Sequence, residues 1–152
     1  MMIAALFFCR EYSLYAERRI LQYKGFLSLL SHAEGMITRF LAKGEELWRG
    51  FSDSALEECG FLSDLREGRG LKEAFSSCEN RLCLPRSVKD ELSAFFSDFG
   101  RSYKEGQLSS LSAFRSSLEE RLKAEEADLE KSVKVTKALI LGGAMSVVIL
   151  II

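Results

Sequence analysis

Residues 102–134 read SYKEGQLSSLSAFRSSLEERLKAEEADLEKSVK, a stretch that no proline interrupts. Its apolar residues recur mostly at spacings of three and four, which places them on one face of an α-helix. This face carries Leu108, Leu111, Phe114, Leu118, Leu122, Leu129 and Val133. Ser102 precedes Glu105 by three residues, a capping box that marks a helix start. The stretch therefore predicts one long amphipathic helix.

A second long helix is predicted from Tyr12 to Leu41, because apolar residues again recur at helical spacing. They are Ile20, Tyr23, Leu27, Leu30, Ile37 and Leu41. Gly25 and Gly35 lie inside this helix, and each costs about 1 kcal/mol relative to alanine. We therefore expect the helix to bend or to divide at a glycine.

Shorter helices are predicted between these two. Ser54 with Glu57 forms another capping box, and Gly60 is expected to end the helix that it starts. The sequence Gly68-Arg69-Gly70 predicts a tight turn, since it lacks the pattern of a phosphate-binding loop. Helical spacing then resumes at Leu71, and Pro85 separates that element from the next. The last of the short helices carries a stripe of Val88, Leu92, Phe95, Phe96 and Phe99.

Composition agrees with an all-α fold, specifically an antiparallel helical bundle with a C-terminal transmembrane helix. The 152 residues contain one proline, and 47% are hydrophobic while 28% are charged. Alternating β-branched runs, which strands require, are missing from the body of the sequence. The net charge of -1 offers no basic excess for nucleic acid, so no nucleic-acid partner is expected.

The sequence predicts no catalytic, cofactor or metal site. Cys9, Cys59, Cys78 and Cys83 have neither zinc-site spacing nor the density of a disulfide scaffold, and most are expected to act as small apolar residues. The single histidine, His32, has no second ligand at metal-binding spacing, so a structural role is favoured. The protein is predicted not to be an enzyme.

The tail at residues 138–152 contains no charged residue and is predicted to be a transmembrane anchor. Fifteen residues rise about 22 Å against a hydrocarbon core of about 30 Å, so Lys134 and Lys137 would snorkel or the bilayer would thin. A buried core helix is the alternative. Lysines precede the tail and none follows it, which predicts a cytoplasmic body.

The predicted domains are an apolar N-terminal segment at residues 1–16, the cytoplasmic bundle at 17–137 and the anchor at 138–152. The N-terminal segment is too short to span and is expected to be a partial anchor, unless the start is truncated. Within the anchor, Ala138, Gly142 and Ser146 recur every four residues. Such a strip allows close helix packing in membranes, although small residues are also merely tolerated there.

Several short motifs resemble the stage III sporulation protein AB family over roughly residues 20–152. They are Phe51-Ser52-Asp53, Cys59-Gly60-Phe61-Leu62, Leu65-Arg66-Glu67-Gly68, Phe99-Gly100-Arg101-Ser102-Tyr103 with Glu105 and Gln107, and Gly142-Gly143 before an aliphatic end. The resemblance implies a platform protein of a secretion-like channel between mother cell and forespore. It also implies binding to a cytoplasmic ATPase similar to stage III sporulation protein AA, and a location in the mother-cell membrane around the forespore.

A partner-binding role is hypothesised for Arg101, Glu105 and Gln107, which lie where the resemblance is densest and a helix begins. Glu105 acting only as a helix cap is the simpler interpretation. Other membrane proteins of the channel and further copies of the chain are the remaining expected partners. The alternative function is a tail-anchored helical adaptor or regulatory protein that binds another cytoplasmic partner.

Overall fold

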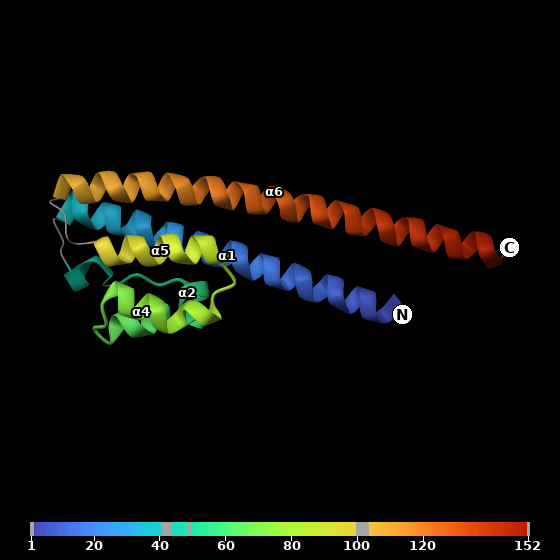
Figure 1. Cartoon of the computed structure of the whole chain (residues 1–152), viewed down its shortest axis with the longest axis horizontal. Helices are drawn as coiled ribbons and strands as arrows, with labels where there is room; N and C mark the ends of the chain where they lie inside the picture. Colours follow the sequence, from blue (N-terminus) through green and yellow to red (C-terminus); the bar gives the residue numbers. More distant parts are fainter. Residues whose placement is uncertain (1, 41–43, 49, 100–103, 152) are drawn as a thin grey trace.

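In the computed structural model, two long helices run antiparallel and carry a group of short helices on one side (Figure 1). The structure describes residues 2–40, 44–48, 50–99 and 104–151. Within its helices, the side chains of residues 2–10, 12, 40, 44, 45, 104, 105 and 136–151 lie outside the described part. The described residues form helices without any strand, so the predicted all-α fold and helical bundle are confirmed.

Helix α1 spans Met2–Phe40 without a break, so the predicted division at a glycine is wrong. Gly35 has open space around it. Gly25 instead permits close packing, because a Cβ atom there would lie 2.7 Å from Asp53 Oδ1 and 3.0 Å from Leu56 Cγ. The segment predicted as a separate N-terminal element forms the first part of α1.

Three short helices follow the 3-10 helix Gly44–Trp48: α2 (Ser54–Glu58), α3 (Phe61–Arg66) and α4 (Leu71–Cys78). The cap of α2 is Asp53, whose side chain accepts a hydrogen bond from the Leu56 backbone amide at 3.1 Å. The prediction of Ser54 as the cap is therefore wrong by one residue. Gly60 and Gly68 have φ angles of 86° and 82°, so the predicted breaks at both glycines are confirmed.

Helix α5 spans Arg86–Asp98 and begins directly after Pro85, as predicted. It runs back along the two long helices, and α6 (Lys104–Ile151) then returns in the opposite direction. The segment between α4 and α5 is fixed to α1, because the buried Gln22 accepts a hydrogen bond from the Cys83 amide at 2.7 Å. A polar side chain thus holds the short helices on the long pair.

The core lies where α1, α5 and the short helices meet. Phe26 of α1 is fully buried and has its ring centroid 5.5 Å from Phe61, 6.0 Å from Phe75 and 6.1 Å from Phe96. Phe95 extends this cluster to α6 by stacking on Phe114 with centroids 4.5 Å apart. The predicted aromatic stripe of α5 is therefore core, and it joins both long helices to the short ones.

Both chain ends lie on the same side of the molecule, beyond the short helices (Figure 1). The ribbons of α1 and α6 diverge toward these ends. Among the described residues, no helix contains a stretch that is long and apolar enough to cross a bilayer. The side chains of the predicted anchor at 138–152 lie outside the described residues, although the helix itself continues to Ile151.

Candidate partner-binding site

Two of the residues hypothesised to bind a partner, Glu105 and Gln107, belong to the start of α6, at the end of the bundle opposite the two termini (Figure 1). Arg101 lies outside the described residues, and so does the side chain of Glu105. Gln107 is half-buried in the first turns of α6. The structure therefore places the backbone of Glu105 and Gln107 on one helix end and leaves Arg101 untested.

Aromatic residues pack against one another at this end of the bundle. Trp48 of the 3-10 helix packs on Phe99, with ring centroids 5.8 Å apart, and Phe99 packs on Phe95 at 5.5 Å. Trp48 and Phe99 are both half-buried, whereas the neighbouring Leu47 is buried. This end thus combines partly exposed aromatic rings with the polar start of α6, a composition suited to protein contacts.

Ion pairs join α6 to its neighbours along the bundle. Arg19 Nη1 of α1 donates to both carboxylate oxygens of Glu125, at 3.1 and 2.9 Å. A second pair joins Arg115 to Glu34 of α1 at 2.5 Å, and further pairs are Lys24 with Glu126 and Arg121 with Glu91 of α5. Three of these pairs join α6 to α1 across the two long helices, and the pair of Arg121 with Glu91 joins α6 to α5.

Tyr23 is 1% exposed and lies among these charges. Burial raises the pKa of its hydroxyl above the usual 10, and the carboxylate of Glu125 raises that pKa further. Arg121 and Arg19 oppose the shift. The hydroxyl therefore remains protonated at neutral pH, and the cluster is a structural junction between the helices.

Two buried thiols also lie together. Cys59 directly follows α2 and Cys78 ends α4, and both side chains are buried. The adjacent Cys78 thiol lowers the pKa of Cys59 to about 7, whereas Cys59 and burial raise the pKa of Cys78. Each sulfur also lies 3.3 Å from a carbonyl oxygen of its own helix. Their expected role as small buried residues is confirmed for these two cysteines.

His32 is half-buried with its ring centroid 5.3 Å from that of Phe51. Its Nε2 atom is buried and has no hydrogen-bond partner among the described residues. The same part of the chain contains no group of three or more histidine, cysteine or acidic side chains that could hold a metal ion. A packing role for His32 follows from its contact with Phe51.

The strip of Ala138, Gly142 and Ser146 belongs to the last part of α6. Because this helix is continuous, their four-residue spacing keeps the three positions on one side of it. Their side chains lie outside the described residues, so packing against them remains a prediction.

The fold defines an all-helical protein with two long antiparallel helices and both ends on one side. Comparison with known families then gives the particular family. The model of the stage III sporulation protein AB family matches residues 1–152, so the chain belongs to this family. Membership indicates a role in stage III of sporulation. No curated protein and no solved structure matches the chain.

Sequence reasoning missed the ion pairs between helices. Within α6, the Glu119 carboxylate lies 3.5 Å from Arg115 Nε, and Glu130 pairs with Lys134 at 2.7 Å. Both pairs join residues four positions apart, the spacing at which side chains on one helix meet. Helical spacing identifies partners within one helix, whereas partners on different helices depend on a register that only the folded chain reveals.

Proposed function

We propose that this chain is a non-enzymatic platform component of a secretion-like channel between mother cell and forespore. Its tail at 138–152 anchors it in the mother-cell membrane around the forespore. The helical body then lies in the cytoplasm, where it binds a secretion-type ATPase similar to stage III sporulation protein AA. Membership of the sporulation family supports the cellular process.

The observation that carries the proposal is the position of the two chain ends. The uncharged tail and the apolar segment before Arg10 both extend from the same side of the body. A flat membrane can therefore receive both segments while the body stays on one side of it. The lysines at 131, 134 and 137 precede the tail, which favours a cytoplasmic body.

The same arrangement supports an ATPase contact at the far end of the bundle. From Lys104 to Lys137, α6 is one helix, and at 1.5 Å per residue it spans about 50 Å. The start of α6 is thus held well away from the membrane surface. Glu105 and Gln107 belong to this end, and Arg101 precedes them closely in the sequence. The half-buried Trp48 and Phe99 add apolar contact area there.

Co-purification tests the proposal. The full chain, extracted in mild detergent, is expected to retain the stage III sporulation protein AA-like ATPase. Arg101→Glu should reduce the retained ATPase several-fold, because reversed charge opposes a contact at this end. Arg86→Glu is the matched control, since Arg86 is exposed at the opposite end of α5.

Each outcome decides a different point. Equal retention by both variants would remove Arg101 from the interface. Failure of the unmodified chain to retain the ATPase would overturn the platform function and favour an adaptor for another cytoplasmic partner. Helicity measured by circular dichroism establishes that each variant is folded.

A further inference from the structure

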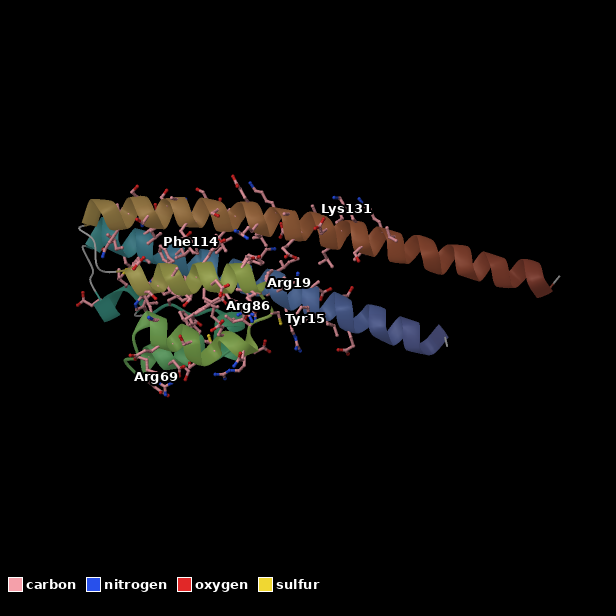
Figure 2. The ribbon with its side chains drawn as sticks, viewed as in Figure 1. Tyr15, Arg19, Arg69, Arg86, Phe114 and Lys131 are labelled. Atoms are coloured by element: carbon pink, nitrogen blue, oxygen red, sulfur yellow. The ribbon has the colours of Figure 1, made fainter. Side chains whose placement is uncertain are left out.

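Exposed apolar side chains gather on one part of the molecule. Among the described residues, the large apolar side chains that are exposed are Leu14 (41%), Tyr15 (47%), Leu21 (54%) and Val135 (58%). They all belong to the parts of α1 and α6 that approach the chain ends. We call residues 10–21 and 128–137 the stem. Figure 2 shows Tyr15 and Lys131 on these two parts.

The lengths of the apolar ends place a boundary on each helix of the stem. The uncharged run of α6 begins at Ala138, and the uncharged run of α1 ends at Cys9. The headgroup layer outside the hydrocarbon core is about 5 to 7 Å thick, and a helix crosses it in about four or five residues. Counted back from the uncharged runs, this layer covers about residues 133–137 and 10–14, and Tyr15 lies at its outer edge.

The register of the two helices supports this placement independently. The pairs Arg19 with Glu125 and Glu34 with Arg115 fix which residues lie level along the antiparallel pair. Because both helices rise about 1.5 Å per residue, Leu14 lies level with about residues 130–135. The exposed Val135 falls at this level. The positions of the charged residues and the register of the two helices therefore place the boundary at the same level.

Side-chain chemistry at this level also suits the headgroup layer. Tyrosine is enriched at membrane interfaces because its ring is apolar while its hydroxyl is polar. The Tyr15 ring lies 5.3 Å from the Arg19 guanidinium, whose charge is paired with Glu125. Lys134 is exposed at this level, where anionic lipids attract lysine, although it also pairs with Glu130 at 2.7 Å. The exposed Glu11 lies at the same level on α1.

We propose that Leu14, Tyr15 and Val135 lie in the headgroup layer of a phospholipid bilayer, so that lipid covers these exposed apolar side chains. This inference rests on the proposed anchoring and adds the depth at which the protein sits. Leu21 lies seven residues beyond Leu14, about 10 Å along the helix, and therefore stays in water. An exposed leucine on the same helix is thus the natural control.

Tryptophan quenching measures this depth on the full chain. In a Trp48→Phe background, single tryptophans are introduced as Tyr15→Trp, Val135→Trp, Leu21→Trp and Met145→Trp. The variants are reconstituted into vesicles of phosphatidylethanolamine and phosphatidylglycerol. Aqueous iodide and phospholipids brominated at different acyl depths serve as quenchers. Circular dichroism establishes the helical content of every variant.

Quenching by iodide should be several-fold weaker for Tyr15→Trp and Val135→Trp than for Leu21→Trp. Lipids brominated near the headgroup should quench the first two, and lipids brominated deeper should quench Met145→Trp. If Tyr15→Trp and Val135→Trp were as open to iodide as Leu21→Trp while Met145→Trp was quenched by lipid, the inferred depth would be wrong and the anchor would stand. If lipid failed to quench Met145→Trp, the anchoring itself would be wrong.

Discussion

The long helix pair and the group of short helices are held together in different ways. The helices α1 and α6 bury apolar residues that recur at helical spacing, such as Leu30 and Leu118, and ion pairs such as Arg19 with Glu125 add polar contacts between them. The helices α2, α3 and α4 depend on turns at Gly60 and Gly68 and on the close approach of Asp53 to Gly25. Periodicity in a sequence therefore reveals the first region well. The second depends on local geometry that periodicity does not describe.

The largest expected effect comes from Phe26, where the two regions meet. Phe26→Ala removes a fully buried ring that contacts α3, α4 and α5. The lost transfer energy and the cavity should lower the free energy of unfolding by about 3 to 5 kcal/mol. Urea unfolding of the full chain in detergent micelles, followed by Trp48 fluorescence, measures this change.

Val135→Ala is the control for this cavity effect, because Val135 is 58% exposed. It should change the free energy of unfolding by less than about 0.5 kcal/mol. Equal effects of the two substitutions would show that the aromatic cluster does not connect the two regions.

The second prediction contrasts two glycines of α1. Alanine at Gly25 would place its Cβ atom 2.7 Å from Asp53 Oδ1, so Gly25→Ala should destabilise the protein by about 2 kcal/mol despite better helix propensity. Gly35 has open space around it, so Gly35→Ala should stabilise by about 1 kcal/mol. Thermal unfolding of both variants tests the opposite signs. Two stabilising substitutions would contradict the close contact between α1 and α2.

The two glycines also show how far sequence reasoning reached. The helices themselves were predictable, since apolar residues at spacings of three and four mark the buried stripes of α5 and α6. The packing role of Gly25 was not predictable, because the residues that contact it come from a segment about thirty residues later in the chain. Both glycines were expected to weaken one helix, yet only the fold distinguishes a packing position from an open one.

The candidate site was less predictable than the fold. Resemblance to a family selected Arg101, Glu105 and Gln107, and the structure describes the side chain of Gln107 alone. The apolar stem residues Leu14 and Val135 carried no signal in the sequence, because each lies off the predicted stripe and single apolar residues are common on helix surfaces. Their exposure is seen only in the folded chain, where both residues lie on the stem.

The third prediction concerns the ion pair between Arg19 of α1 and Glu125 of α6. Arg19→Met leaves the partly buried Glu125 without its two hydrogen bonds, which should destabilise the protein by about 1.5 kcal/mol. Lys134→Met breaks the exposed pair with Glu130 and should cost at most about 0.5 kcal/mol. Urea unfolding at low and high salt compares them. A larger loss at Lys134 would reverse the ranking of these pairs.

The smallest expected effect tests the correction at the start of α2. Asp53 accepts the hydrogen bond of the Leu56 amide, so Asp53→Ala should lower the free energy of unfolding by about 1 kcal/mol. Asp53→Asn keeps an acceptor oxygen and should recover most of this loss. Ser54 is the first residue of α2 and makes no capping contact with Leu56, so Ser54→Ala should be nearly neutral. Urea unfolding of the three variants separates the two residues, and a larger loss at Ser54 than at Asp53 would restore the capping box predicted from the sequence. Because the Asp53 carboxylate also faces Gly25, combining Asp53→Ala with Gly25→Ala should cost less than the sum of the two, since the first substitution removes the atom that the second would meet.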